Sequence, residues 1–186
     1  MGTLDAGYIT DPYVFAWYHV GDGSFETQRL VTMVWITLLL NALWAAIPAV
    51  GFGMIFNVPR SALPFCAIGG AFTYALREAL MHQHFSIELS TFIAATAIGI
   101  ISVFWSRRYV MPRPVYTVPS IIPMIPGKYA YEMMISLVSM NSDGVTDTLL
   151  SSFIQNGLHA VSILFAIAFG LVLPSMYYTK RKQPII

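Results

Sequence analysis

The sequence predicts an all-α integral membrane protein with about five transmembrane helices, the fourth of which is broken by a Pro/Gly segment. Three observations predict this class: an apolar composition, apolar runs of membrane-crossing length, and a regular alternation of charge between the runs. Of the 186 residues, 56% are hydrophobic and 10% are charged, whereas a soluble domain usually carries about 25% charged residues. A chain of this length cannot bury so much apolar surface internally, so we expect lipid to cover part of it.

Four apolar runs are candidate crossings, because a helix needs about 20 apolar residues to cross a bilayer. They extend over Leu30–Phe56, Leu63–Met81, Ile87–Trp105 and Leu149–Tyr178. The second run is shorter than the first and carries Arg77 and Glu78 near its end, while the last run carries His159. These runs predict the first, second, third and fifth membrane helices.

The region between the third and last runs is rich in helix-breaking residues. It contains Pro114, Pro119, Pro123, Pro126 and Gly127. Proline removes a backbone donor and clashes with the preceding turn, so we predict an extended or re-entrant piece over Val115–Gly127 and a short helix over Lys128–Met140. Irregular backbone at membrane depth persists only where protein or a wet cavity satisfies its polar groups.

Charges alternate between successive turns of the chain. Every second turn and the C-terminus are basic, through Arg60, Arg107, Arg108, Arg113, Lys180, Arg181 and Lys182. The N-terminal segment and the other turns are acidic, with Arg29 as their only base. Cytoplasmic segments carry the excess of Lys and Arg. We therefore predict an extracytoplasmic N-terminal extension (1–29), a transmembrane domain (30–179) and a basic cytoplasmic tail (180–186).

Small residues recur four positions apart in the apolar runs. The pairs are Ala45 and Ala49, Ala67 and Ala71, Ala95 and Gly99, and Ala166 and Gly170. Such spacing lets membrane helices approach closely, so we expect these pairs to mark helix contacts.

The second run contains adjacent ionisable residues, Arg77 and Glu78, which are functional candidates at membrane depth. Neighbours on a helix point about 100° apart, so these two side chains do not pair with each other. In a functional site, Arg77 would bind a carboxylate and Glu78 would carry a proton. Alternatively, both side chains reach the outer surface near Met81.

A second ionisable pair, Lys128 and Glu132, lies four residues apart and shares a helix face. The helix that begins after Pro126 and Gly127 has free N–H groups and a positive dipole end, and such an end binds anions. In a transporter, this helix start would hold a substrate carboxylate, with Lys128 as an added charge and Glu132 as a proton carrier or counter-charge. The alternative is a structural ion pair.

Histidines are the remaining titratable candidates. His159 follows Gln155 and Asn156 on an apolar helix, which fits either interhelical hydrogen bonding or a proton relay. His82 and His84 form a poor metal site on their own.

No motif indicates other chemistry. The sequence contains no phosphate-binding loop and no plausible base for its serines, and Cys66 is its only cysteine. We therefore predict no enzyme activity, no cofactor and no nucleic-acid partner.

Three short segments form a distinctive combination of motifs. They are AAIPAVGF at 45–52, FNVP at 56–59 and, most specifically, IIPMIPG at 121–127 followed by Ala130 and Tyr131. The sequence over residues 30–182 resembles the small subunit of the split threonine/serine exporter family. Pro123, Pro126 and Gly127 form the matching motif.

This resemblance implies a multi-pass protein of the bacterial inner membrane that works with a larger transmembrane subunit of the same family. Small subunits of this kind, the YjjB-like group, are usually assigned as probable succinate exporter subunits, while fused relatives are associated with threonine and serine export. The resemblance thus implies an exporter domain over 30–179 and a small carboxylate, such as succinate, as substrate. A threonine/serine exporter subunit and a non-transporting membrane scaffold are the alternatives.

Overall fold

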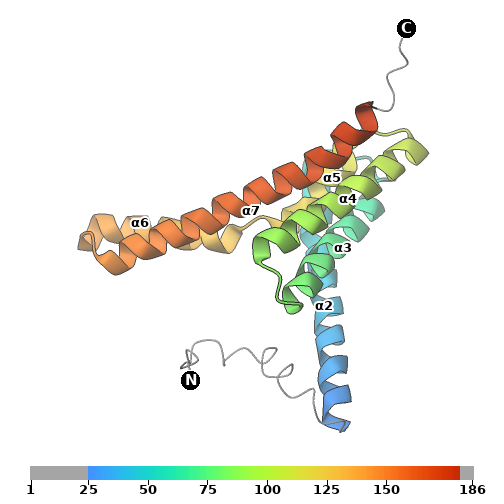
Figure 1. The fold of residues 1–186 in the computed structure, drawn as a ribbon. Coiled ribbons are helices and arrows are strands. Elements are labelled where there is room, and N and C mark those ends of the chain that lie inside the picture. The colour runs from blue at the N-terminus through green and yellow to red at the C-terminus, as the bar shows by residue number, and fades with distance from the viewer. Residues whose placement is uncertain (1–24, 181–186) are drawn as a thin grey trace.

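The structure is a computed structural model that describes residues 25–180, and this part of the chain is helical with no strand (Figure 1). Its elements are α2 (Phe25–Ile55), α3 (Leu63–His82), α4 (Ile87–Tyr109), α5 (Pro114–Ile121), the 3-10 turn η2 (Ile122–Met124), α6 (Gly127–Asp143) and α7 (Asp147–Lys180). The all-α prediction is confirmed for these residues. Most of the predicted extension and the tail after Lys180 lie outside them.

Among the residues that the structure describes, three helices are long and apolar enough to cross a membrane. The apolar stretches are Thr32–Ile55 in α2, Ile87–Tyr109 in α4 and Asp147–Met176 in α7. In the most apolar window of α4, 44% of the residues are buried, against 22% for α2 and 28% for α7, so α4 is the most buried of the three. The remaining two of the five crossings, through α3 and the α5–α6 region, stay a prediction.

Local sequence sets the ends of these helices. Ser86 caps α4, because its side-chain oxygen accepts a hydrogen bond from the backbone N–H of Leu89. Val110 ends the same helix in the left-handed conformation, with φ of 53°. Asn57, with φ of 55°, turns the chain after α2, a conformation that asparagine tolerates well.

Small residues make the close helix contacts, as expected. A Cβ at Gly70 of α3 would overlap the Cβ of Ala49 on α2. A Cβ at Gly170 of α7 would lie 2.8 Å from the Cβ of Ala95 on α4. In α3, Gly69 and Gly70 both make such close contacts, with Ser120 of α5 and Ala49 of α2.

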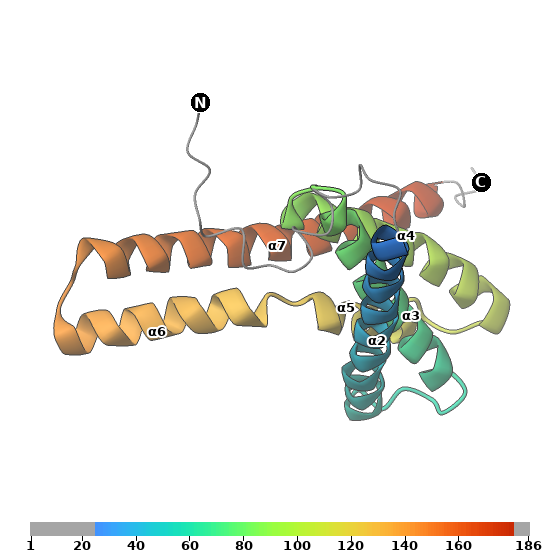
Figure 2. The ribbon, with the colours of Figure 1, turned by 90° about the horizontal axis from the view of Figure 1, so that it is seen from below.

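The chain reverses direction after α4 and again before α7. These two helices pack side by side and run in the same direction, and α5, η2 and α6 together bring the chain back between them (Figures 1 and 2). α5 packs against α2, α3 and α4, whereas α6 pairs with α7 in a long antiparallel hairpin that projects from the rest of the molecule. Met133 of α6 lies against Gly157 of α7 within this hairpin.

The predicted shape of the Pro-rich region is wrong in its first half. Residues 114–121 form an α-helix, not an extended piece, and the irregular backbone is confined to η2 and residues 125–126. Pro114 occupies the first turn of α5, where its missing N–H costs nothing. Pro119 lies inside the helix, where it cannot bond the carbonyl of Val115. The thiol of Cys66 on α3 donates to that carbonyl instead, at 3.4 Å.

Candidate functional site

One face of α3 lines the broken segment formed by α5, η2 and the start of α6. Cys66, Thr73 and Arg77 lie at i, i+7 and i+11, so they share this face. Each donates to a backbone carbonyl of the broken segment, respectively that of Val115, Ser120 and Met124. Neighbouring helices are thus the source of the missing hydrogen bonds, which is the condition under which broken backbone persists in a membrane.

Thr73 is the most deeply enclosed of the three. Its side chain is fully buried, and Oγ1 lies 2.8 Å from the carbonyl oxygen of Ser120, where α5 passes into η2. The same Oγ1 lies 3.0 Å from the carbonyl oxygens of Gly69 and Gly70 in its own helix. Because a hydroxyl carries one proton, the shortest contact identifies Ser120 as its main acceptor.

Arg77 brings a positive charge to the break. Its Nη1 donates to the carbonyl oxygen of Met124 at 3.0 Å, and its Cζ lies 5.1 Å from the centre of the Tyr74 ring. The guanidinium is partly buried, and its carbonyl partner belongs to the broken segment. A guanidinium has five N–H donors, so it can bond a carboxylate while it keeps its carbonyl partner.

α6 starts three residues after Met124, whose carbonyl Arg77 bonds. The first i to i−4 hydrogen bond of α6 joins the N–H of Ala130 to the carbonyl of Pro126. The N–H groups of Lys128 and Tyr129 come before this bond, so the helix itself offers them no i−4 acceptor. A Cβ at Gly127 would meet nothing within 4 Å, so the space beside the helix start is open.

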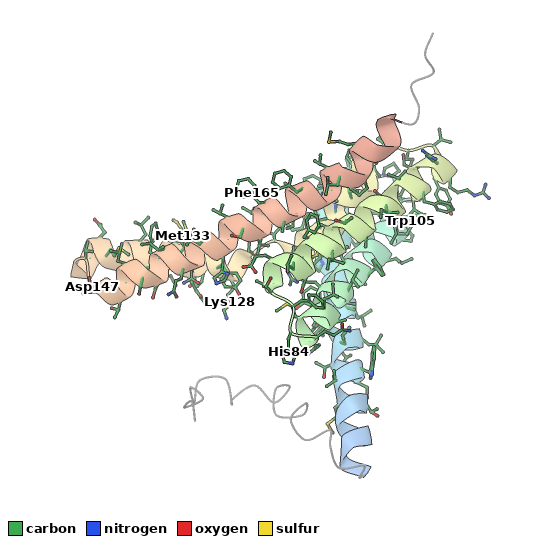
Figure 3. All side chains as sticks on the ribbon, viewed as in Figure 1. His84, Trp105, Lys128, Met133, Asp147 and Phe165 are labelled. Atoms are coloured by element: carbon green, nitrogen blue, oxygen red, sulfur yellow. The ribbon has the colours of Figure 1, made fainter. Side chains whose placement is uncertain are left out.

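The Lys128 and Glu132 side chains lie on the surface instead of at the break. Lys128 Nζ is 3.9 Å from Glu132 Oε1, and the two side chains are 81% and 41% exposed. The predicted i, i+4 pair is therefore present near the start of α6, where Figure 3 labels Lys128. Arg77 bonds the carbonyl of Met124, which lies between Pro123 and Pro126 in the sequence, whereas the Lys128 side chain is exposed.

Glu78 points to the other side of α3, as the 100° spacing predicts. Its Oε1 accepts a hydrogen bond from Asn41 Nδ2 of α2 at 2.8 Å. Its Oε2 is buried and has no hydrogen-bond partner. The sequence analysis does not identify Asn41, because only the packing of α2 on α3 brings Asn41 and Glu78 together.

His159 joins three helices. Its Nδ1 lies 2.8 Å from Glu88 Oε1 on α4, and the Tyr129 ring of α6 lies 5.2 Å from the imidazole. The expected interhelical hydrogen bond is therefore present, with Glu88 as its partner. Sequence reasoning missed Glu88, which is separated from His159 by 71 positions. It also missed Thr73 and Cys66, although their helical spacing from Arg77 could have revealed them.

The architecture defines the class: a helical membrane protein whose interior contains a broken helix and partly buried charged groups, as many transporters do. The family described as "Threonine/Serine exporter, ThrE" matches residues 41–177, and the chain belongs to this exporter family.

A relative from Haemophilus influenzae (strain ATCC 51907 / DSM 11121 / KW20 / Rd), described as an uncharacterized protein, is 42% identical over 171 residues. The match covers 92% of this chain and 57% of that protein, so the chain spans little more than half the length of this relative. No solved structure matches the chain.

Proposed function

We propose that the chain is one subunit of a two-component exporter of the bacterial inner membrane, and that it exports small carboxylates, with succinate as the main substrate. The observation that carries this proposal is the Arg77 guanidinium, which is held on the break between α5 and α6. Broken helices in transporters hold substrate carboxylates in this way, and arginine is the side chain best suited to bond a carboxylate with two parallel hydrogen bonds.

Substrate binding at Arg77 would act directly on the break. The guanidinium bonds the carbonyl of Met124, three residues before α6 begins. A carboxylate bound to Arg77 and to the free N–H groups of Lys128 and Tyr129 would connect α3 to α6 through the substrate. Pro123, Pro126 and Gly127 keep the two half-helices separate, so α6 can move relative to α5. Movement of α6 on substrate binding is the conformational step we propose for export.

Five crossings with the N-terminus outside are supported by where the basic turns lie. Phe65 at the start of α3 stacks on Tyr109 at the end of α4, with ring centroids 4.7 Å apart. Arg113, before α5, donates to Ser175 near the end of α7 at 3.0 Å. The start of α3, the turn between α4 and α5 and the end of α7 thus lie near one another, and the positive-inside rule would assign this end to the cytoplasm. The return of the chain between the parallel helices α4 and α7 supports a complete fourth crossing.

A larger partner subunit is supported by an exposed polar stripe on α7. Thr148, Ser152, Gln155 and His159 share one face of this largely apolar helix, and all four are exposed. Polar side chains in a membrane face protein or a wet cavity rather than lipid. We propose that the partner covers this stripe and that the two subunits together enclose the hydrated path. His159, paired with Glu88, would relay protons along it.

Threonine or serine is the second candidate substrate, and the description of the family is compatible with it. A zwitterion needs a carboxylate site and an acceptor for its ammonium group. Glu132 and Glu78 are the carboxylates nearest in sequence to the break and to Arg77, but each already has a partner in Lys128 or Asn41. A scaffold without transport activity, the remaining alternative, would tolerate loss of the break.

The decisive experiment measures efflux from proteoliposomes that contain this chain and its co-purified partner, preloaded with labelled succinate and labelled threonine. We expect selective loss of succinate. Selective loss of threonine would move the assignment to amino-acid export. Retention of both labels by a folded complex would reject both substrates. Replacing Pro126 and Gly127 by alanine should abolish efflux, whereas Arg60→Gln, in an exposed turn, should leave it unchanged. Normal efflux from the Pro126/Gly127 variant would reject the proposed site.

A further inference from the structure

Arginine side chains gather where two candidate membrane helices end. The apolar stretches of α4 and α7 that are long enough to cross a membrane end at Tyr109 and Met176, and these ends lie at the same end of the molecule (Figures 1 and 2). Arg107 and Arg108 lie in the last turn of α4, and Arg113 immediately precedes α5. Because basic residues flank membrane helices at the level of the lipid head groups, we expect these arginines to lie there.

The segments that meet at this end contain no acidic residue. Residues 55–77, 91–131 and 148–186 include no Asp or Glu, so the counter-charge for the arginines has to come from outside these segments. In a bilayer, anionic phospholipids supply negative charge at the head-group level and attract nearby lysine and arginine side chains. The charge of this surface therefore fits an anionic lipid.

Arg113 is held in place by a neutral partner. Its Nη1 donates to Ser175 Oγ of α7 at 3.0 Å, and the residue is half-buried. A hydroxyl does not balance the charge of the guanidinium. A guanidinium has five N–H donors, so the bond to Ser175 leaves donors for an anion, and the planar fork of arginine matches two oxygens of a phosphate. A phosphate bound there would lie where the start of α5 meets the end of α7.

The turn that presents Arg108 and Arg113 is fixed by its own contacts. Ser106 Oγ donates to the carbonyl of Met111 at 2.6 Å, which closes the turn between α4 and α5. A cluster of aromatic rings, with centroids 4.7–5.9 Å apart, joins this turn to α3, and Figure 3 labels one of its members, Trp105. The rings are those of Phe65, Trp105, Tyr109 and Tyr116. The two arginines thus stand on a backbone that is already held in place before an anion binds.

We propose that Arg108 and Arg113 bind the head-group phosphate of an anionic phospholipid. Arg113 would supply two parallel hydrogen bonds to the phosphate, and Arg108 would add a second positive charge. The bound lipid would hold the turn between α4 and α5 against the end of α7. This inference is independent of the proposed transport activity and of the direction in which the chain crosses the membrane.

The test is titration of the purified full-length chain in detergent with phosphatidylglycerol and, separately, with phosphatidylcholine. Native mass spectrometry resolves the chain with no lipid from the chain with one bound lipid. Phosphatidylcholine carries the same phosphate but balances it with a positive choline group. We expect the first phosphatidylglycerol to bind at least about 10-fold more tightly than phosphatidylcholine. Equal affinities for the two lipids would overturn the proposal.

Three variants distinguish a defined site from diffuse attraction. Arg113→Gln removes the paired hydrogen bonds and should weaken phosphatidylglycerol binding by about 10- to 100-fold. Arg108→Gln changes an exposed side chain, so it should fold normally and weaken binding by about 5-fold. Arg60→Gln removes the same charge from the exposed turn between α2 and α3 and should weaken binding by less than about 2-fold.

Two results with these samples would overturn the proposal. An affinity loss in Arg60→Gln as large as that in Arg108→Gln would show that the lipid responds to the overall charge of this end and not to a site. This comparison does not depend on Arg113→Gln, whose loss of the bond to Ser175 also affects packing. Displacement of bound phosphatidylglycerol by inorganic phosphate would assign the arginines to a free anion instead of a lipid. Persistence of the lipid in phosphate buffer is the expected result.

Discussion

At the scale of single residues, Thr73 makes the most enclosed contact between α3 and the broken segment. Replacing it by valine keeps the shape but leaves the buried carbonyl of Ser120 without its 2.8 Å donor. We expect a loss of about 1–3 kcal/mol in unfolding free energy. Thermal unfolding of the purified chain in detergent would measure it. The control is Thr37→Val, because Thr37 bonds only the Met33 carbonyl of its own helix and should cost less than about 0.5 kcal/mol.

Arg77 can be tested without removing its charge. Lysine has no planar fork, so Arg77→Lys cannot bond a carboxylate through two parallel hydrogen bonds. We expect the KM for succinate efflux to rise by about 10- to 100-fold, equivalent to about 1.4–2.7 kcal/mol. Concentration-dependent efflux from proteoliposomes would measure it. An unchanged KM would show that Arg77 supports the fold of the break rather than the substrate.

The contacts of the candidate site could be predicted only in part from the sequence. The divergence of Arg77 and Glu78 follows from helix geometry and was predicted. The partners of these side chains, Met124 and Asn41, depend on how three helices pack, and helical periodicity carries no such information. The exposed position of Lys128 was also unpredictable, because it depends on which side of α6 packs against α7.

At the scale of elements, the α2–α3 contact depends on glycine. Gly70→Ala would place a Cβ against Ala49 and force the helices apart, so we expect a loss of about 1–3 kcal/mol in unfolding free energy. Gly51→Ala is the matched control on α2, because nothing lies within 4 Å of a Cβ there. That variant should be neutral or more stable by up to about 1 kcal/mol. Equal effects in detergent unfolding would contradict this packing.

The helices themselves were well predicted, because long apolar runs bounded by polar turns leave little choice. The expected run Leu63–Met81 became α3 at Leu63–His82. The Pro-rich region was predicted less well. Proline spacing indicates where a helix loses hydrogen bonds, but α5 survives because Cys66 bonds the carbonyl that Pro119 leaves free. Such rescue by another helix cannot be recognised from the local sequence.

At the scale of the whole molecule, the membrane orientation that we propose rests on the position of the basic turns, and two cysteine variants test it. Gln83→Cys lies in the exposed turn between α3 and α4, and Ser61→Cys lies in the exposed turn between α2 and α3. A membrane-impermeant maleimide should label Gln83→Cys in intact cells and Ser61→Cys only after permeabilisation. The native Cys66 is fully buried and should give little background. The reverse labelling pattern would invert the proposed topology.

The hydrogen bonds from α3 to the broken segment have a consequence for sequence variation. All three acceptors are main-chain carbonyls, so α3 recognises the path of the backbone rather than the side chains along it. Substitutions at Val115 or Ser120 that preserve the backbone would leave these bonds intact, whereas changes at Thr73 or Arg77 would remove them. In a saturation mutagenesis experiment, we therefore expect few substitutions to be tolerated at Thr73 and Arg77 of α3. Positions of the broken segment should tolerate more substitutions, within the limits of their packing.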